Sequence, residues 1–159
     1  MNEKNMTEVN IETEDLQGRY LLFNIDNMEY SVSLAMVLEI IQTRNITHLP
    51  HLAPYIKGII NLRGKIVPVI DVRLKFGIEE KPMDDQTCII IAEVKNMQIG
   101  LIVDTVSEVV TVDKNKLSIP PATKEMSAWY VDSVTERNNK VVLNINLEKL
   151  FREDVAVHK

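Results

Sequence analysis

Short apolar runs, separated by tight polar turns, dominate the hydrophobic pattern of this chain. Runs of about four to eight residues that are rich in valine and isoleucine are typical of β-strands. The first two, residues 20–25 and 29–32, flank Asp26-Asn27, which predicts a hairpin turn. Further strands are predicted at residues 59–62, 65–72, 87–94, 98–103 and 140–145.

Two features modify this all-strand pattern. Pro68 lies inside the run 65–72 and has no N–H to donate, so its strand is predicted to be an edge strand or to be bulged at that point. Helix-like spacing of Leu34, Val37, Leu38 and Ile41 predicts a short helix over residues 34–41. A second short helix is predicted at residues 147–154. The fold class is therefore mainly β, with a few short helices.

The second half of the chain repeats the first. Residues 25–41 align without a gap on residues 94–110, and residues 65–71 align on residues 140–146. The matched pairs include Asn27 with Asn96, Met28 with Met97, Val37 with Val106, Glu39 with Glu108 and Phe76 with Phe151. Two copies of a β-rich unit of ~70 residues indicate an internal duplication. Chance similarity between two apolar, β-rich halves is the alternative.

Strands this short suit small closed barrels, and two such barrels would gain stability by sharing a core. The predicted organisation is a flexible N-terminal tail (1–17) followed by one domain (18–154). Within that domain we expect a first barrel at about 18–77, a second at about 86–146 and a C-terminal helix at about 147–154.

Composition narrows the class of partner. The 159 residues are 45% apolar, enough for a real core, and the formal net charge is −5. Without a cluster of Lys and Arg, neither nucleic acid nor an anionic membrane surface is an expected partner. No apolar window approaches the ~18–20 residues that span a bilayer, and no secretory signal is present. A cytoplasmic protein is expected, and its single cysteine, Cys88, fits a reducing compartment.

The candidates for catalysis and metal binding are sparse. His48 and His51 lie in a proline-flanked loop with no nearby cysteine or carboxylate to complete a metal site. The glycines form neither a phosphate-binding loop nor a nucleophile elbow. A catalytic triad assembled in space remains an alternative. We expect a binding module that has no cofactor rather than an enzyme.

Residues 55–73, YIKGIINLRGKIVPVIDVR, resemble the signature of CheW-like domains. The centre of that signature is Asn61-Leu62-Arg63-Gly64, and the resemblance extends over about residues 18–151. Ser31 and Ser33 stand where the family would place a glycine and an acidic residue. The resemblance implies two SH3-like, five-stranded β-barrels packed on a shared hydrophobic core.

The resemblance also implies a function. CheW-like proteins are adaptors of bacterial chemotaxis that couple the histidine kinase CheA to chemoreceptors. The implied partners are the CheW-like regulatory domain of CheA and the cytoplasmic tip of a methyl-accepting receptor, in membrane-associated arrays. The same adaptor role in a non-flagellar chemosensory pathway is the alternative.

Candidate site residues follow from the pattern and the resemblance together. Glu39 and Arg63 are charges set between apolar neighbours, so we predict a salt bridge that supports the wall of a receptor-binding groove; two independent surface charges are the alternative. The resemblance places Val37 on this groove, which it locates between the two barrels, and Ile40 shares the face of Val37 if the segment is helical, with core packing as the alternative for Ile40. The other groove candidates are Cys88, Ile89 and Val106. The kinase-interface or structural candidates are Gly58, Asn61, Gly64, Gly100 and Val109.

Overall fold

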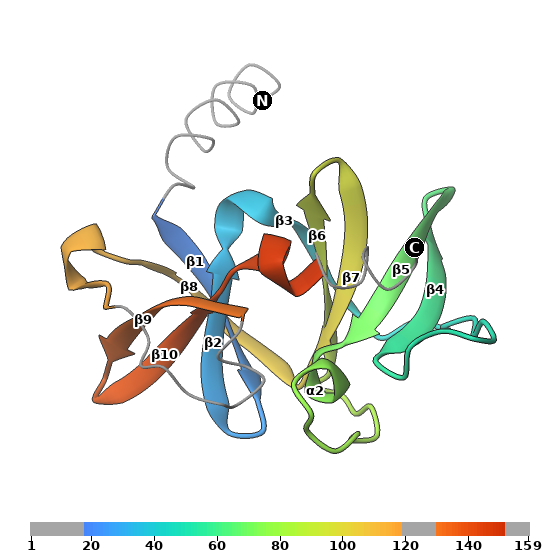
Figure 1. Cartoon of the computed structure of the whole chain (residues 1–159), viewed down its shortest axis with the longest axis horizontal. Helices are drawn as coiled ribbons and strands as arrows, with labels where there is room; N and C mark the ends of the chain where they lie inside the picture. Colours follow the sequence, from blue (N-terminus) through green and yellow to red (C-terminus); the bar gives the residue numbers. More distant parts are fainter. Residues whose placement is uncertain (1–17, 119–129, 152–159) are drawn as a thin grey trace.

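The structure, a computed structural model, describes residues 18–118 and 130–151. In this part of the chain, ten strands form two five-stranded sheets that lie side by side (Figure 1). Sheet A has the order β8 (Thr105–Thr111), β1 (Arg19–Ile25), β2 (Met28–Ser33), β10 (Lys140–Ile145), β9 (Val131–Arg137). Sheet B has the order β3 (Val37–Gln42), β6 (Cys88–Val94), β7 (Met97–Val103), β5 (Lys65–Asp71), β4 (Ile56–Leu62).

Helical structure is short. It comprises η1 (Leu34–Met36), α2 (Val72–Lys75), η2 (Lys114–Lys116) and residues 147–151. The mainly β class with a few short helices is therefore confirmed. The predicted tail at 1–17 and the last residues of the predicted helix at 147–154 lie outside the described residues.

The predicted helix over residues 34–41 is wrong. Only Leu34–Met36 forms a single 3-10 turn, and the chain continues as strand β3, which pairs with β6. The β-branched residues Val37, Ile40 and Ile41 favour this extended pairing over a helix. Consequently Val37 and Ile40 do not share a face: Val37 is half-buried against the core, whereas Ile40 is exposed.

The predicted barrel boundaries are also wrong. Sheet A takes β1 and β2 from the first repeat but β8, β9 and β10 from the second, and sheet B takes the complementary set. Each sheet therefore needs strands from both halves of the chain, and the two repeats have exchanged strands. The contiguous segments 18–77 and 86–146 do not correspond to the two sheets. We call the two curved sheets barrel A and barrel B.

The duplication itself is confirmed in the backbone hydrogen bonds. The amide of Asp71 donates to the carbonyl of Tyr55 at 2.7 Å, and that of Asn146 donates to Tyr130 at the same 2.7 Å. Both hairpin turns, at Asp26-Asn27 and Lys95-Asn96, have two residues with positive φ. This backbone geometry is that of a type I′ turn, the turn that best fits the twist of a two-residue hairpin.

One apolar core joins the two barrels. It combines residues of sheet A, such as Phe23 and Tyr30, with residues of sheet B, such as Ile90 and Leu101. Phe76, which follows α2, packs between the rings of Tyr30 and Tyr130 at centroid distances of 5.3 and 5.9 Å. The shared core implied by the resemblance is thus present, and it fixes one barrel against the other.

Pro68 lies on β5, which is an inner strand of sheet B. Its partner on β4 is Ile59, and the pairing of β5 with β7 begins only at Val69. At Pro68 the strand is therefore locally an edge, which agrees with the prediction, since a proline there removes no hydrogen bond to β7.

The interiors of the two barrels differ in polarity. In barrel A the buried Ser31 hydroxyl donates to Asn144 Oδ1, and Asn144 Nδ2 donates to Ser133 Oγ at 2.8 Å. The equivalent positions in barrel B are Gly100, Val69 and Gly58. Barrel A thus holds a hydrogen-bonded polar network where barrel B is apolar, and the serine at position 31 belongs to that network.

Candidate functional site

Glu39 and Arg63 form the predicted salt bridge. Arg63 Nη1 lies 2.5 Å from Glu39 Oε2, and Nη2 donates to Oε1 at 3.1 Å, so the contact is bidentate. The prediction is confirmed, but its premise of desolvation is wrong for the arginine, whose side chain is 72% exposed while that of Glu39 is 27% exposed. The hydrogen bond from Arg63 lowers the pKa of the Glu39 carboxyl, and the same bond raises the pKa of the guanidinium.

The position of this ion pair explains what it does. Glu39 is on β3 and Arg63 is in the turn between β4 and β5, and β3 and β4 are the two ends of sheet B. The pair therefore spans the two ends of the sheet and helps to close barrel B. We call this contact, made by Glu39 and Arg63, the barrel B seam.

Barrel A has an equivalent contact that the sequence reasoning missed. Arg137 on β9 pairs with Glu108 on β8, and these strands are the two ends of sheet A. Glu108 is the repeat counterpart of Glu39. We call the pair Glu108–Arg137 the barrel A seam. The repeat alignment pointed to Glu108, but its partner comes from strand β9, which the apolar pattern did not predict.

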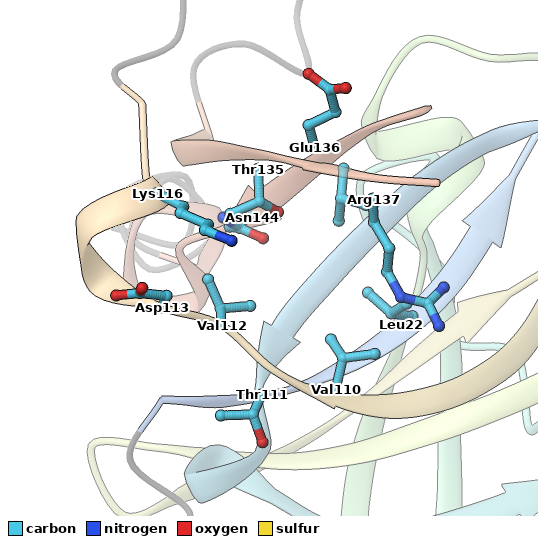
Figure 2. A pocket seen from close by; sticks show the side chains of 11 residues that line it. Leu22, Val110, Thr111, Val112, Asp113, Lys116, Thr135, Glu136, Arg137 and Asn144 are labelled. Carbon is cyan, nitrogen blue, oxygen red and sulfur yellow. The ribbon is translucent and has the colours of Figure 1, made fainter. Parts of the chain in front are cut away.

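Figure 2 shows a shallow hollow beside the barrel A seam. It lies between β8 with η2 on one side and the β9–β10 hairpin on the other, and Leu22 lies at its floor. The charged side chains at its rim include Asp113, Lys116 and Arg137. A similar hollow at the barrel B seam is lined by Leu38, Glu39, Leu62, Arg63, Lys65, Ile91 and Gln98.

Exposed apolar side chains accompany both seams. Ile40 on β3 and Val109 on β8 are repeat counterparts, and both are exposed. The same holds for Met28 with Met97 and for Ile66 with Val141. Each of these three pairs places one residue on each barrel, so the two barrels present similar exposed apolar positions. Leu38 on β3 is also exposed, but its repeat counterpart is Ser107. An exposed apolar side chain gains free energy when a partner removes it from water, so these positions are candidates for protein binding.

The remaining groove candidates lie at different depths. Val37 and Val106 are repeat counterparts that pack, half-buried, against the shared core where the chain passes from one sheet to the other. Cys88 is half-buried at the start of β6, and its thiol lies 3.4 Å from the carbonyl of Gln86. Ile89 is fully buried in the core of barrel B. No partner can touch Ile89 without unfolding β6, so its assignment to a binding groove is wrong.

Gly100 and the candidates of the signature segment, Gly58, Asn61 and Gly64, have structural roles. A Cβ on Gly58 would lie 2.1 Å from the carbonyl oxygen of Thr47, and one on Gly100 would lie 2.9 Å from Ile89 Cγ2. Asn61 Oδ1 accepts the N–H of Gly64 at 3.0 Å, which fixes the turn that carries Arg63. The signature thus positions Arg63 at the surface by requiring a tight turn and a close strand approach.

The described residues show no group of three potential metal ligands, and no helix among them is long and apolar enough to cross a bilayer. His48 and His51 are exposed in the loop between β3 and β4, as predicted.

Comparison with known proteins agrees with this geometry. Residues 19–155 match the family model of the CheW-like domain. The chain is 32% identical to the chemotaxis protein CheW of Bacillus subtilis over 128 residues, which cover 80% of this chain and 81% of that protein. It is 28% identical to the chemotaxis protein CheW of Klebsiella aerogenes, over 89% of this chain and 86% of that one.

A solved structure is also similar. The crystal structure of the scaffolding protein TtCheW from Thermoanaerobacter tengcongensis superposes with a TM-score of 0.79 at 34% identity, covering 84% of this chain and 87% of that chain. The overall fold of this chain is therefore similar to that of a known CheW structure. This chain is a member of the CheW family of chemotaxis adaptor proteins.

Proposed function

We propose that this protein couples the histidine kinase CheA to the cytoplasmic tip of a methyl-accepting chemoreceptor by binding both at once. The observation that supports the proposal is the pair of similar surfaces, one on each barrel. Each surface combines an ion-paired seam with an exposed aliphatic residue, Ile40 or Val109. Arginine is among the residue types enriched at binding hot spots, and an exposed aliphatic side chain next to it gains free energy when a partner covers it.

In this proposal the receptor tip docks at the barrel B seam. Glu39 and Arg63 hold the two ends of sheet B together, and Ile40 supplies an apolar contact next to them. A receptor helix would lay its apolar stripe along this surface, in the helix-in-groove mode. Val37, at the start of the same strand, packs against the shared core and anchors β3 there.

The regulatory domain of the kinase docks on barrel A, next to Val109. That domain is expected to have the same fold as this chain, so a barrel-to-barrel contact would pair similar surfaces. The adaptor itself catalyses nothing in this proposal. It fixes the kinase relative to the receptor, so that a change in the receptor biases an equilibrium of the kinase. Its working place is the cytoplasmic side of a receptor array.

Two single substitutions test the assignment. Ile40→Asp places a charge in the receptor surface, and Val109→Asp does the same in the kinase surface. Both variants are tested by co-sedimentation with purified receptor and kinase fragments. Ile40→Asp should weaken the affinity for the receptor fragment by at least about tenfold and leave the affinity for the kinase fragment unchanged, and Val109→Asp should do the reverse. Gln42→Asp and Thr111→Asp are the matched controls, because both positions are exposed on the same strands and add the same charge without removing an apolar side chain.

The outcome separates the assignment from the function. If Ile40→Asp loses the kinase and Val109→Asp loses the receptor, the two surfaces are assigned the wrong way round. If both folded variants bind both partners as the unaltered protein does, the proposal that these surfaces carry coupling is wrong.

A further inference from the structure

Arg73 lies at a point where segments of both barrels meet. Its Nη1 donates to Asp104 Oδ2 at 2.6 Å, its Nη2 to Asp26 Oδ1 at 3.3 Å and its Nε to the carbonyl oxygen of Glu79 at 2.8 Å. The side chains of Arg73 and Asp104 are each only 12% exposed. All three guanidinium nitrogens therefore have protein acceptors, and we call this set the Arg73 cluster. Its contact with Asp104 is enclosed, whereas the side chain of Asp26 is 58% exposed.

The members of the Arg73 cluster come from different sheets. Asp26 is in the β1–β2 turn of barrel A, whereas Arg73 is in α2, directly after β5 of barrel B. Asp104 is the single residue between β7 of barrel B and β8 of barrel A. Asp104 Oδ2 also accepts the N–H of Asp26 at 2.9 Å, and its own N–H donates to Asn24 on β1 at 3.1 Å. One carboxylate thus joins the hairpin of barrel A to the chain crossing between the barrels.

The chemistry of arginine makes this contact directional. A guanidinium is planar and presents its N–H groups in a fixed fork, so satisfying three acceptors fixes its orientation and theirs. Low exposure also limits screening by salt, in contrast to surface ion pairs. The Arg73 cluster therefore holds the two barrels together and also resists rotation of one barrel against the other.

A neighbouring contact anchors the same helix to both repeats. Lys75 is buried, and its Nζ lies 4.0 Å from the ring centroid of Tyr55 and 5.5 Å from that of Tyr130. These tyrosines are repeat counterparts that lead into β4 and β9. Helix α2 is consequently held at the junction of the barrels by two of its residues. Arg73 contacts the carboxylates, and Lys75 contacts the tyrosine rings.

The duplicated half of the molecule cannot form the same cluster. In the repeat alignment the counterpart of Arg73 is Glu148, and the counterpart of Asp104 is Ala35. Asp26 is matched by Lys95. The central guanidinium is therefore replaced by a carboxylate, and the carboxylate at the chain crossing is replaced by a methyl group that can accept no hydrogen bond. The arginine-centred contact is specific to one end of the junction between the barrels.

We propose that Arg73 is a positioning residue that fixes the angle between barrel A and barrel B. The two partner surfaces lie on different barrels, so the Arg73 cluster also sets the orientation of one partner relative to the other. This last step rests on the proposed coupling function. The fixed angle itself does not depend on it.

The angle can be measured in the free protein with two spin labels. Cys88→Ala removes the single native thiol, and Ile66→Cys and Val141→Cys place labels at exposed positions of barrel B and barrel A. Pulsed electron spin resonance should give one narrow distance distribution for this background. Arg73→Gln and the isosteric Asp104→Asn should each widen it about twofold or add a second distance, and Arg73→Lys should give an intermediate width.

Arg137→Gln is the matched control, because it breaks an arginine–carboxylate pair within barrel A alone. It should leave the distribution unchanged. Folded Arg73→Gln and Asp104→Asn variants with the narrow distribution of the background would overturn the proposal. If Arg73→Gln does not fold, Asp104→Asn decides. If neither folds, the Arg73 cluster stabilises the whole fold rather than the angle, and the proposal is equally wrong.

A second measurement connects the angle to coupling. Arg73→Gln should bind the receptor fragment and the kinase domain separately with affinities within about twofold of the unaltered protein, yet transmit less receptor control to kinase phosphorylation. If Arg73→Gln widens the distance distribution but the receptor still controls kinase phosphorylation fully, then Arg73 fixes the angle between the barrels and coupling does not depend on that angle. Failure of both partners to bind even the unaltered protein would refute the proposed function and leave the distance result standing.

Discussion

Arg63 shows how the backbone can set the direction of an exposed side chain. It has a positive φ of 52° in the β4–β5 turn, next to Gly64, and the side chain of Asn61 holds that turn closed. The backbone thus aims the guanidinium at Glu39 before the ion pair forms. The contribution of the pair to binding would then come from the shape that it gives to the end of barrel B.

Charge reversal at the barrel B seam tests this role. Arg63→Glu sets two carboxylates against each other and should abolish binding of the receptor fragment, because like charges push the two ends of sheet B apart. The double variant Glu39→Arg with Arg63→Glu restores opposite charges and should recover part of the binding. A pull-down with receptor fragments measures both. Binding of Arg63→Glu at the level of the unaltered protein would refute the role of the seam.

Asp71 offers a prediction about pH. It is buried at the start of α2, where its Oδ1 accepts the N–H of Arg73 at 3.0 Å, and desolvation raises the pKa of its carboxyl above the ordinary 3.8. The native state then holds this proton more tightly than the unfolded state does. The contribution of Asp71 to the free energy of unfolding therefore falls as the pH rises through the window above 3.8.

Asp71→Asn should remove that dependence while keeping an acceptor for the helix start. Urea unfolding at several pH values should show Asp71→Asn gaining in stability relative to the unaltered protein as the pH rises from the acid side of this window to neutrality. Asp85→Asn, in an exposed loop, is the control and should give a smaller change with pH. The tested quantity is the free energy of unfolding of Asp71→Asn minus that of the unaltered protein. If this difference is constant with pH, or decreases toward neutrality, the pKa of Asp71 is not raised in the native state.

Among the elements, β4 depends on a close approach that only glycine allows. Gly58 has a φ of +147°, and a Cβ there would collide with the backbone of Thr47, which forms an isolated bridge to Ile59. Gly58→Ala should therefore destabilise the protein by at least about 3 kcal/mol in chemical unfolding. Gly77→Ala is the control, because it has a positive φ but open space around it, and should cost only about 1 kcal/mol. Equal costs would mean that the close approach does not matter.

Element by element, the sequence pattern was informative where apolar residues form a continuous run, as in β1 and β6, and misleading where apolar and polar residues are mixed. The hairpins at Asp26-Asn27 and Lys95-Asn96 have turn residues that favour positive φ, so their strands were predictable. The spacing of strand β3 resembles that of a helix, because its apolar residues lie at a bulge next to Val37 and on an exposed surface rather than on one buried face. Strand β9 carries Asp132, Glu136 and Arg137 among few apolar residues, so periodicity could not reveal it.

The candidate site was predictable in part for the same reason. The pairing of Glu39 with Arg63 followed from two charges that are each set between apolar neighbours, whereas Glu108 with Arg137 and the Arg73 cluster involve charges that have no such mark in the sequence. Such contacts depend on which strands pair. The exchange of strands between the repeats cannot be read from either repeat alone.

At the scale of the whole molecule, this exchange makes the two halves interdependent. A fragment with residues 1–83 contains β1 to β5, but the hairpin of β1 and β2 has its outer neighbours, β8 and β10, in the other half. Such a fragment should not fold as a monomer. Mixed with residues 84–159, it should recover β structure and a one-to-one complex, as judged by circular dichroism and sedimentation. A folded monomer of either fragment alone would contradict the strand order of the two sheets.

The central claim is that one chain presents two separate surfaces and holds two different partners at the same time. The most direct measurement is titration of the kinase regulatory domain into the adaptor that is already saturated with receptor fragment, followed by sedimentation of the mixture. We predict that the kinase domain binds without displacing the receptor fragment and that one particle contains all three chains. Displacement of one partner by the other would show a single shared surface and would contradict the account.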